Sequence, residues 1–143
     1  MFVRELFTAD AQPVLERVLA FTEARHSVLA ANVANAETPT WRRQDLPVDA
    51  FSRELARAVA GRARTPGRFA MRPVPLDPSV DRGPFVGRQN HAGILRHDGN
   101  TVDLDREMAI LGRNALLHNT VAALLREKYR GLVAAAEGRN TST

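Results

Sequence analysis

The last third of the chain carries a long apolar repeat whose members are spaced alternately four and three positions apart. This spacing keeps one stripe of a helix facing a partner, so it predicts a coiled-coil helix over about residues 103–137. Such a helix is roughly 50 Å long, more than a chain of this size needs for its own core. The predicted seam consists of Leu104, Met108, Leu111, Ala115, His118, Ala122, Leu125, Tyr129, Leu132 and Ala136. A second apolar row beside it favours packing against several neighbours, as in an assembly protein.

A segment with the same spacing lies near the other end of the chain, over about residues 11–37. Asp10 is a suitable N-cap, and Pro13 falls in the first turn, where its missing N–H costs nothing. Thr38-Pro39 ends the helix, because proline disfavours helical geometry in the residue before it. The sequence therefore predicts an all-α fold in which long N- and C-terminal helices pair as an antiparallel coiled coil.

The residues between these helices, about 38–102, are predicted to form a largely irregular arm rich in proline, glycine and arginine that projects from one end of the pair. Asp103 then serves as the N-cap of the last helix. Residues 50–59 fit a short helix with one apolar side and one charged side, made respectively of Phe51, Leu55 and Ala58 and of Arg53, Glu54 and Arg57. The chain 1–143 is predicted to be a single domain of this elongated, axial type.

Composition limits the possible functions. There is no cysteine, which excludes disulfides, thiol nucleophiles and cysteine metal sites. The net charge of +4 and a pI near 10.8 suggest acidic partners. However, Lys128 is the single lysine among 20 basic residues, and a bias toward arginine can also reflect genomic base composition. The alternative function is thus a basic coiled-coil protein that associates with nucleic acid, resting on the run Arg53, Arg57, Arg62, Arg64, Arg68 and Arg72.

We predict no catalytic, cofactor-binding or metal-binding residues, and hence no enzyme. Residues 98–103 resemble the start of a calcium loop, but Val102 and Asp103 break its pattern. His26 and His118 occupy the two predicted seams and are most simply explained as buried neutral side chains. The remaining histidines, in the arm, are weak metal-site candidates: His91 and His97.

The first ten residues contain Glu5 and Asp10 and lack the apolar core of a leader peptide. No stretch approaches the ~18 apolar residues that a membrane span needs. A cleaved secretion signal and membrane insertion are therefore not expected.

Two asparagines, Asn32 and Asn35, share one face at the end of the first helix. Asparagine lowers helix propensity, so this pair indicates a structural role, either capping where the helix ends or bonding to a neighbouring chain. Trp41, just after the proline, is an anchor for packing within this chain or in a partner.

This stretch, AANVANAETPTWR, resembles the N-terminal signature of the bacterial flagellar rod and hook proteins, ANNIANANTPGYK. The direct matches are Asn32, Ala34, Asn35, Ala36, Thr38 and Pro39, and Val33, Trp41 and Arg42 match in kind. The family has a glycine where this chain has Thr40. Glycine permits a positive φ that a β-branched residue resists, so either this turn needs no positive φ or it differs locally.

A second segment, Gly99–Met108, is similar to the start of the closing helix in the proximal rod subunits of that family. The resemblance implies a structural subunit of the rod, the helical drive shaft that crosses the periplasm and transmits motor torque. It implies export through the flagellar type III apparatus, and contacts with itself, other rod subunits and the membrane-ring and rod-adapter proteins, without nucleic acid. The implied assembly interface comprises Asn32, Asn35, Thr38, Pro39, Trp41, Leu104, Met108, Leu111, Leu125, Tyr129 and Leu132.

Overall fold

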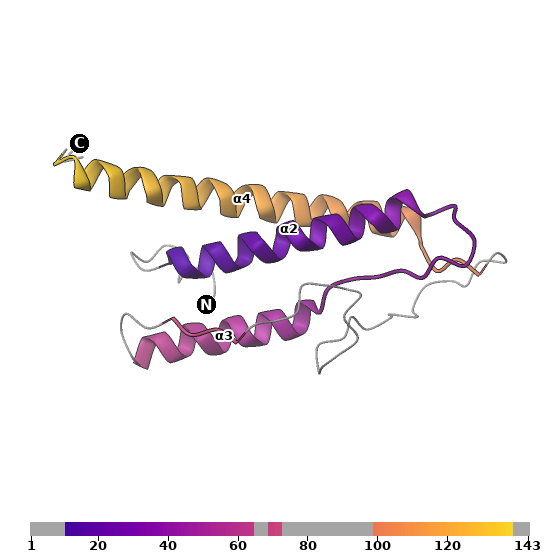
Figure 1. Cartoon of the computed structure of the whole chain (residues 1–143), viewed down its shortest axis with the longest axis horizontal. Coiled ribbons are helices and arrows are strands. Elements are labelled where there is room, and N and C mark those ends of the chain that lie inside the picture. The colour runs from indigo at the N-terminus through magenta and orange to yellow at the C-terminus, as the bar shows by residue number, and fades with distance from the viewer. Residues whose placement is uncertain (1–10, 65–68, 73–98, 139–143) are drawn as a thin grey trace.

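The computed structural model describes residues 11–64, 69–72 and 99–138. These residues contain three helices: α2 (Gln12–Ala34), α3 (Val48–Arg64) and α4 (Leu104–Ala136). No strand occurs within the described ranges, which confirms the prediction of an all-α fold for this part of the chain (Figure 1). None of these helices is long and apolar enough to span a membrane.

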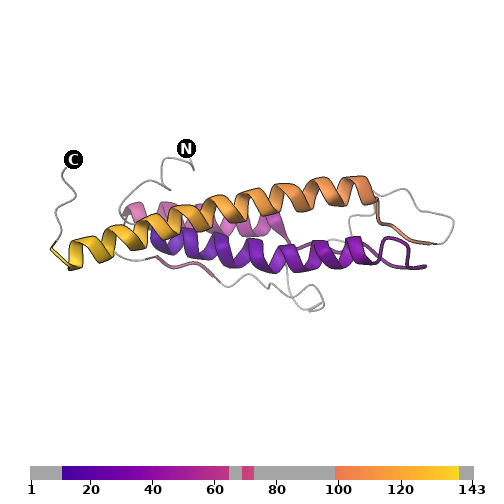
Figure 2. The same ribbon diagram turned by 90° about the horizontal axis from the view of Figure 1, so that it is seen from above.

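The two long helices at the ends of the described chain pack against each other, as predicted. Hydrogen bonds join Gln12 to Tyr129, Thr22 to Asn114 and Asn32 to Glu107. As residue numbers rise along α2 they fall along α4, so the two helices run in opposite directions. Figures 1 and 2 show them side by side along most of α2, with the last turns of α4 extending beyond the start of α2.

The predicted register of the α4 seam is wrong by part of a turn. The side chains of α4 that are buried or bonded against α2 are Glu107, Asn114, His118, Val121, Leu125 and Tyr129. Three residues of the predicted seam are instead 42–55% exposed and form no hydrogen bond to α2 within the described ranges: Leu104, Met108 and Leu132. The reason is that the polar residues Glu107 and Asn114 occupy the real seam and are satisfied there, whereas the prediction did not admit them.

The second correction concerns the arm, because its first part does not project from the helix pair. Residues 48–64 form α3, longer than the predicted 50–59, and α3 lies along the side of α2 opposite α4 (Figure 1). The rings of Phe21 and Phe51 stack with centroids 4.0 Å apart. Leu46 and Leu55 join the same core. The remainder of the predicted arm, residues 65–68 and 73–98, lies outside the described residues.

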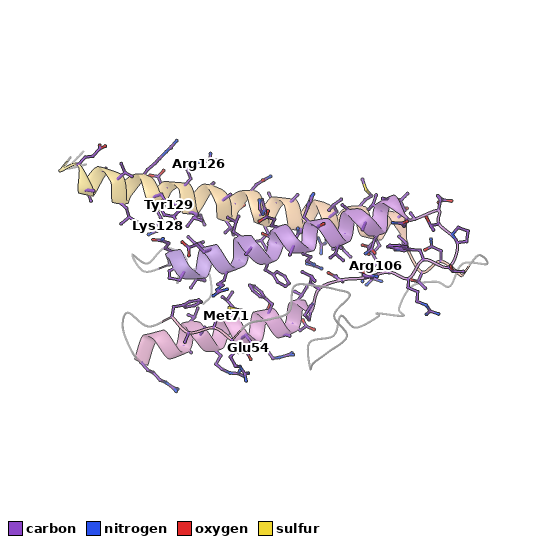
Figure 3. The ribbon with its side chains drawn as sticks, viewed as in Figure 1. Glu54, Met71, Arg106, Arg126, Lys128 and Tyr129 are labelled. Atoms are coloured by element: carbon purple, nitrogen blue, oxygen red, sulfur yellow. The ribbon has the colours of Figure 1, made fainter. Side chains whose placement is uncertain are left out.

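Glu54, predicted to face water, is 5% exposed. Arg72 binds it through two nitrogens and Arg57 through one. The hydrogen bond from Arg72 is the main reason that the pKa of Glu54 is lowered. Residues 69–72 thereby return to α3, and Phe69 and Met71 pack on the core (Figure 3).

The helix ends follow ordinary capping chemistry. α2 starts after Ala11 with a proline in its first turn, and Asp10 lies outside the described residues. α2 ends at Ala34, three residues before the predicted end, and Asn35 is its C-cap. α4 begins after Asp103, whose side chain accepts a bond from the backbone N–H of Arg106 at 3.2 Å. This is the N-cap that the sequence predicts.

Candidate functional site

The end of α2 is held by a buried asparagine that uses its whole side-chain amide. Asn32 is 0% exposed. Its Nδ2 donates to the carbonyl of Gln44 at 2.6 Å and to Oε2 of Glu107 at 3.1 Å. Its Oδ1 accepts from the backbone N–H of Gln44 at 3.0 Å and from Nε1 of Trp41 at 3.4 Å. One side chain thus joins α2, the segment after it and α4.

A second buried asparagine closes the turn from the other half of the chain. Asn100 is 0% exposed, and its Nδ2 lies 3.0, 3.0 and 2.8 Å from the carbonyl oxygens of Asn35, Ala36 and Thr38. Its Oδ1 accepts from the N–H of Val102 at 2.7 Å. These carbonyls belong to the turn that follows α2, so Asn100 holds this turn from a position far away in sequence.

A chain of charged groups lies beside these amides. Glu107 is 0% exposed and accepts a hydrogen bond from Nε of Arg43. Arg43 also contacts Asp45 at 3.2 Å, and Arg25 binds Asp45 through two nitrogens at 2.8 Å each. Burial alone would lower the pKa of Arg43, but hydrogen bonding and charge from Glu107 and Asp45 outweigh it and raise the pKa. A buried carboxylate such as Glu107 requires this pairing, because an unpaired charge is costly to bury.

The predicted asparagine pair splits between two environments. Asn35 is only partly buried, and its Nδ2 donates to the carbonyl of Ala31 at 2.8 Å. Its Oδ1 accepts from the hydroxyl of Thr38 at 3.1 Å. Trp41 is half-buried against Asn32, whereas Thr38 and Pro39 are exposed. Both asparagines thus bond within the chain at the helix exit, and a contact of Asn35 with a neighbouring chain stays a prediction.

Thr40 adopts a φ of 63°, so the alternative that this turn needs no positive φ is wrong. The turn needs a positive φ, and threonine adopts it in place of the family's glycine. Gly99, with a φ of 77°, lies opposite, and a Cβ on it would be 3.8 Å from atoms of Thr40. The N–H of Thr101 donates to the carbonyl of Trp41 at 3.2 Å, and the N–H of Arg43 to the hydroxyl of Thr101 at 2.9 Å. The two family-like segments therefore lie side by side.

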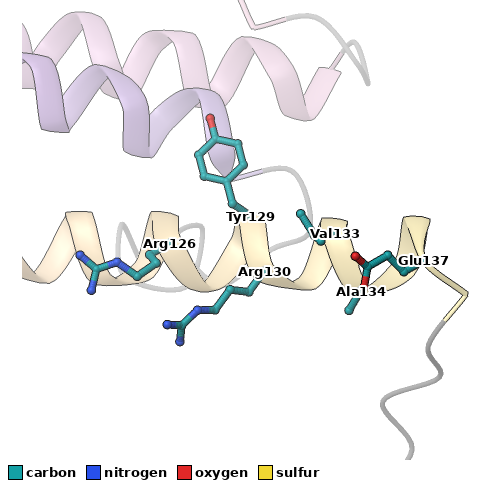
Figure 4. Close-up of a pocket in the computed structure, with 6 residues that line it drawn as sticks. All are labelled: Arg126, Tyr129, Arg130, Val133, Ala134 and Glu137. Carbon is teal, nitrogen blue, oxygen red and sulfur yellow. The ribbon is translucent and has the colours of Figure 1, made fainter.

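The other predicted interface residues lie on α4 and divide into inner and outer groups. Leu125 is buried in the core of this chain and Leu111 is half-buried. Leu104, Met108 and Leu132 are exposed. Tyr129 is 45% exposed, and its hydroxyl bonds Glu16 at 2.9 Å and Gln12 at 3.2 Å. Beside it runs an open groove lined by Arg126, Tyr129, Arg130, Val133, Ala134 and Glu137 (Figure 4).

The two histidines of the predicted seams differ. His118 lies in the interface, with Nδ1 3.0 Å from the hydroxyl of Thr22. His26 is exposed, so its predicted burial is wrong. Within the described part of the chain, no group of three or more potential ligands could hold a metal ion. His91 and His97 lie outside that part.

Sequence reasoning missed the polar residues that hold the helices together, namely Asn100, Glu107 and Asn114. The Nδ2 of Asn114 donates to the carbonyl of Thr22 at 2.8 Å. Glu107, Asn114 and Val121 are seven residues apart, in phase with a heptad. A search that admits polar residues at seam positions would have found this stripe.

Similar proteins identify the family to which these motifs point. A flagellar basal body rod protein FlgB from Cereibacter sphaeroides is 33% identical over 130 residues, covering 90% of this chain and 95% of the relative. FlgB of Salmonella typhimurium is 32% identical over 125 residues, covering 81% and 85%. FlgB of Borrelia hermsii is 31% identical over 108 residues, covering 72% and 78%. No protein-family model matches the chain. All three relatives are flagellar rod proteins, which confirms the predicted resemblance to that family.

We predict that Asn100→Ala lowers the free energy of unfolding by about 1–3 kcal/mol, because the turn after α2 loses a buried donor, and with it the bond to the carbonyl of Ala36. Trp41 is the only tryptophan and lies at this turn, so its fluorescence in a urea titration reports the change. The control is Asn119→Ala, an exposed asparagine of α4, which should shift stability by no more than about 0.5 kcal/mol. Equal unfolding midpoints for the two variants would contradict the proposal that Asn100 stabilises the turn after α2.

We predict that Thr40→Gly stabilises the chain by up to about 1 kcal/mol. A left-handed conformation costs a residue with a side chain about 1–2 kcal/mol, and the added chain entropy of glycine offsets part of that gain. Thr38→Gly is the matched control, because Thr38 lacks a positive φ and donates to Asn35. The Thr38→Gly variant should have a lower free energy of unfolding than the unchanged chain. Thermal unfolding of both variants measures whether each change raises or lowers stability. If Thr40→Gly lowered stability, the side chain of Thr40 would contribute more than its positive φ costs.

We predict that Tyr129, the only tyrosine, titrates above its ordinary pKa of 10.0. Its hydrogen bond with Glu16 is the main cause. A raised folded-state pKa contributes stability that is present below the unfolded pKa and is lost as pH rises through the folded value. Absorbance of the tyrosinate against pH measures the titration directly. Glu16→Gln should return the midpoint toward 10, and an unchanged midpoint would contradict the assigned cause.

Proposed function

This chain belongs to the FlgB family of flagellar basal body rod proteins, and we propose that it is a structural subunit of the proximal rod that assembles through its terminal helices. One observation carries the proposal. The described part of the chain forms a helix pair whose internal contacts are satisfied, yet it leaves several large apolar side chains of α4 exposed. The residues in question are Leu104, Met108, Leu117, Tyr129, Leu132 and Val133, each 42–55% exposed. Extended apolar surface of this kind is typical of interaction sites.

In this proposal α2 and α4 pair as an antiparallel coiled coil, and the exposed apolar side chains of α4 pack on neighbouring subunits. Repeated contacts between different faces of identical subunits generate a helical filament. Such a filament suits a drive shaft that transmits motor torque, because interlocked helices resist twisting without any reactive group. A structural rather than an enzymatic role follows.

The buried amides at the end of α2 support assembly indirectly. Asn32 and Asn100 fix the direction in which the chain leaves α2, and Glu107 fixes the start of α4 relative to that exit. The exposed residues Thr38 and Pro39 at the turn are proposed contacts to neighbours. A subunit that must fit a regular shaft needs this rigidity, because any variation would repeat in every copy.

The proposed location is the rod within the periplasmic space, reached through the flagellar type III export apparatus without a cleaved signal. The proposed partners are other copies of this chain, other rod subunits, and the membrane-ring and rod-adapter proteins of the basal body. We do not propose nucleic-acid binding. Two arginines of the basic run, Arg57 and Arg72, are committed to Glu54, and the curated relatives are rod proteins.

We predict that Leu132→Asp abolishes motility while leaving the fold intact, because Leu132 is exposed in the isolated chain and a carboxylate there would be desolvated only on assembly. The measurement is complementation of a deletion strain, with basal bodies counted by electron microscopy and helix content by circular dichroism. Asn119→Asp, equally exposed on α4, is the charge control and should leave cells motile.

Leu125→Asp should instead disrupt the fold itself, because Leu125 lies in the chain's own core. That variant should lose helix content and unfold. A motile Leu132→Asp strain with normal basal bodies would show that Leu132 is not part of the proposed interface.

A further inference from the structure

The excess positive charge of the chain is confined to residues 48–72. This stretch contains six arginines and two carboxylates, so its net charge of +4 equals that of the whole chain. Of the 20 basic and 16 acidic residues in total, 14 of each remain elsewhere, and they cancel. A genomic bias explains why these basic residues are arginine instead of lysine. It does not explain why the excess charge is gathered in one stretch.

Three of these arginines form a basic row along the outer side of α3, namely Arg53, Arg57 and Arg64. They are four and seven residues apart, so their positions lie within about 40° of each other around the helix axis and span roughly 16 Å. All three are exposed. α3 lies on the side of α2 opposite α4, with its apolar residues packed in the core (Figure 1). Within the described ranges, neither Arg53 nor Arg64 forms an ion pair.

The two carboxylates of α3 leave this surface positive. Glu54 is 5% exposed and binds both Arg57 and Arg72, so one negative charge is shared by two positive ones. The side chains of these arginines stay 63% and 68% exposed. Asp49 is exposed as well, but it lies in the first turn of α3, before the basic row begins at Arg53.

The stability of the helix alone does not account for the basic row. The helix dipole favours a cation near the C-terminal end, where Arg64 is the last residue of α3. Arg53 lies nearer the N-terminal end, where the dipole gives no such advantage. A surface that serves only solubility commonly mixes both signs, as α4 does with its exposed residues Asp105, Arg106, Glu127 and Arg130.

The chemistry of this side of α3 fits a flat anionic surface. Phe51, the one aromatic residue of α3, is stacked on Phe21, so it offers no platform for a nucleic-acid base. Ala56 and Ala60 are exposed beside the basic row, and their small side chains let the helix approach a flat partner closely. In the proposed periplasmic location, the phosphates that form an extended surface are the headgroups of a membrane.

We propose that the basic row of α3 binds the anionic phospholipid headgroups of a membrane surface. The contact is peripheral and electrostatic, because the apolar side of α3 stays packed on α2 and does not enter the acyl chains. This inference rests on the proposed rod function and its location, and it adds a partner that is not a protein.

Sedimentation of the full-length chain with lipid vesicles tests the contact. One set of vesicles contains phosphatidylglycerol and phosphatidylcholine, and the other contains phosphatidylcholine alone. At about 0.1 M salt we expect the chain to bind the anionic vesicles and not the neutral ones. At about 1 M salt the Debye length falls to ~3 Å, so the bound chain should be released. Equal binding to both sets, no binding to either, or binding that persists in high salt would overturn the proposal.

Paired charge variants test whether the basic row is the binding surface. Each basic side chain near an anionic membrane strengthens binding about fivefold, so Arg53→Glu with Arg64→Glu should weaken it by about 25-fold or more. Both changes leave the bonds of Glu54 in place. The matched control is Arg106→Glu with Arg113→Glu, which alters the net charge equally through exposed residues of α4 and should weaken binding by less than about fivefold.

An equal loss in the two double variants, with helix content retained by circular dichroism, would overturn the assignment to α3. A short double-stranded DNA, offered at the same salt concentration, distinguishes the two sources of phosphate. Tighter binding of the DNA than of the anionic vesicles would overturn the choice of a membrane.

The outcome is separable from that of the proposed function. Vesicles that remain unbound, together with a non-motile Leu132→Asp strain, would reject the membrane contact and retain the rod subunit. Bound vesicles together with a motile Leu132→Asp strain would retain the membrane contact and count against the assembly surface on α4.

Discussion

The side-chain amide of Asn32 is the interaction on which the arrangement of the helices depends. Four hydrogen bonds leave one buried group, and they reach three separate parts of the chain: the backbone at Gln44, the ring of Trp41 and the carboxylate of Glu107. An apolar residue could not replace it without cost, because the backbone N–H and carbonyl of Gln44 would both lose their bonds to the Asn32 side chain. The direction in which the chain leaves α2, and hence the position of α3, follows from this amide.

Buried polar groups also set the register of α2 against α4. The contacts of Asn32 with Glu107 and of Thr22 with Asn114 and His118 form two polar layers along the interface, and apolar contacts such as that of Leu15 with the core surround them. A sliding of one helix past the other would leave these groups unpaired. Polar residues at seam positions commonly fix register at some cost in stability. For a rod subunit, a unique register of α2 against α4 gives every copy the same shape, which offsets that loss of stability.

Periodicity and capping residues were sufficient to predict the all-α class, the pairing of the terminal helices and the N-cap at Asp103. They were insufficient for the seam, because the α4 stripe that contacts α2 contains Glu107 and Asn114, which an apolar pattern omits. The packing of α3 was missed for a different reason. Whether a short amphipathic helix folds back depends on a long-range contact such as the stacking of Phe51 on Phe21, and local sequence does not contain that information. The role of Asn100 was missed likewise, since its acceptors lie more than 60 residues away.

The central claim is that this chain is a rod subunit whose internal contacts are complete and whose exposed apolar side chains on α4 pack against neighbours. The most direct measurement is a cryo-electron microscopy structure of the assembled basal body that contains this chain. The account predicts that the exposed side chains of Leu104, Met108, Leu132 and Val133 become buried against neighbouring subunits, while the contacts of Asn32 and Asn100 remain within one chain. A rod in which these α4 side chains still face solvent, or in which Asn32 bonds a neighbour in place of Gln44 and Glu107, would contradict it.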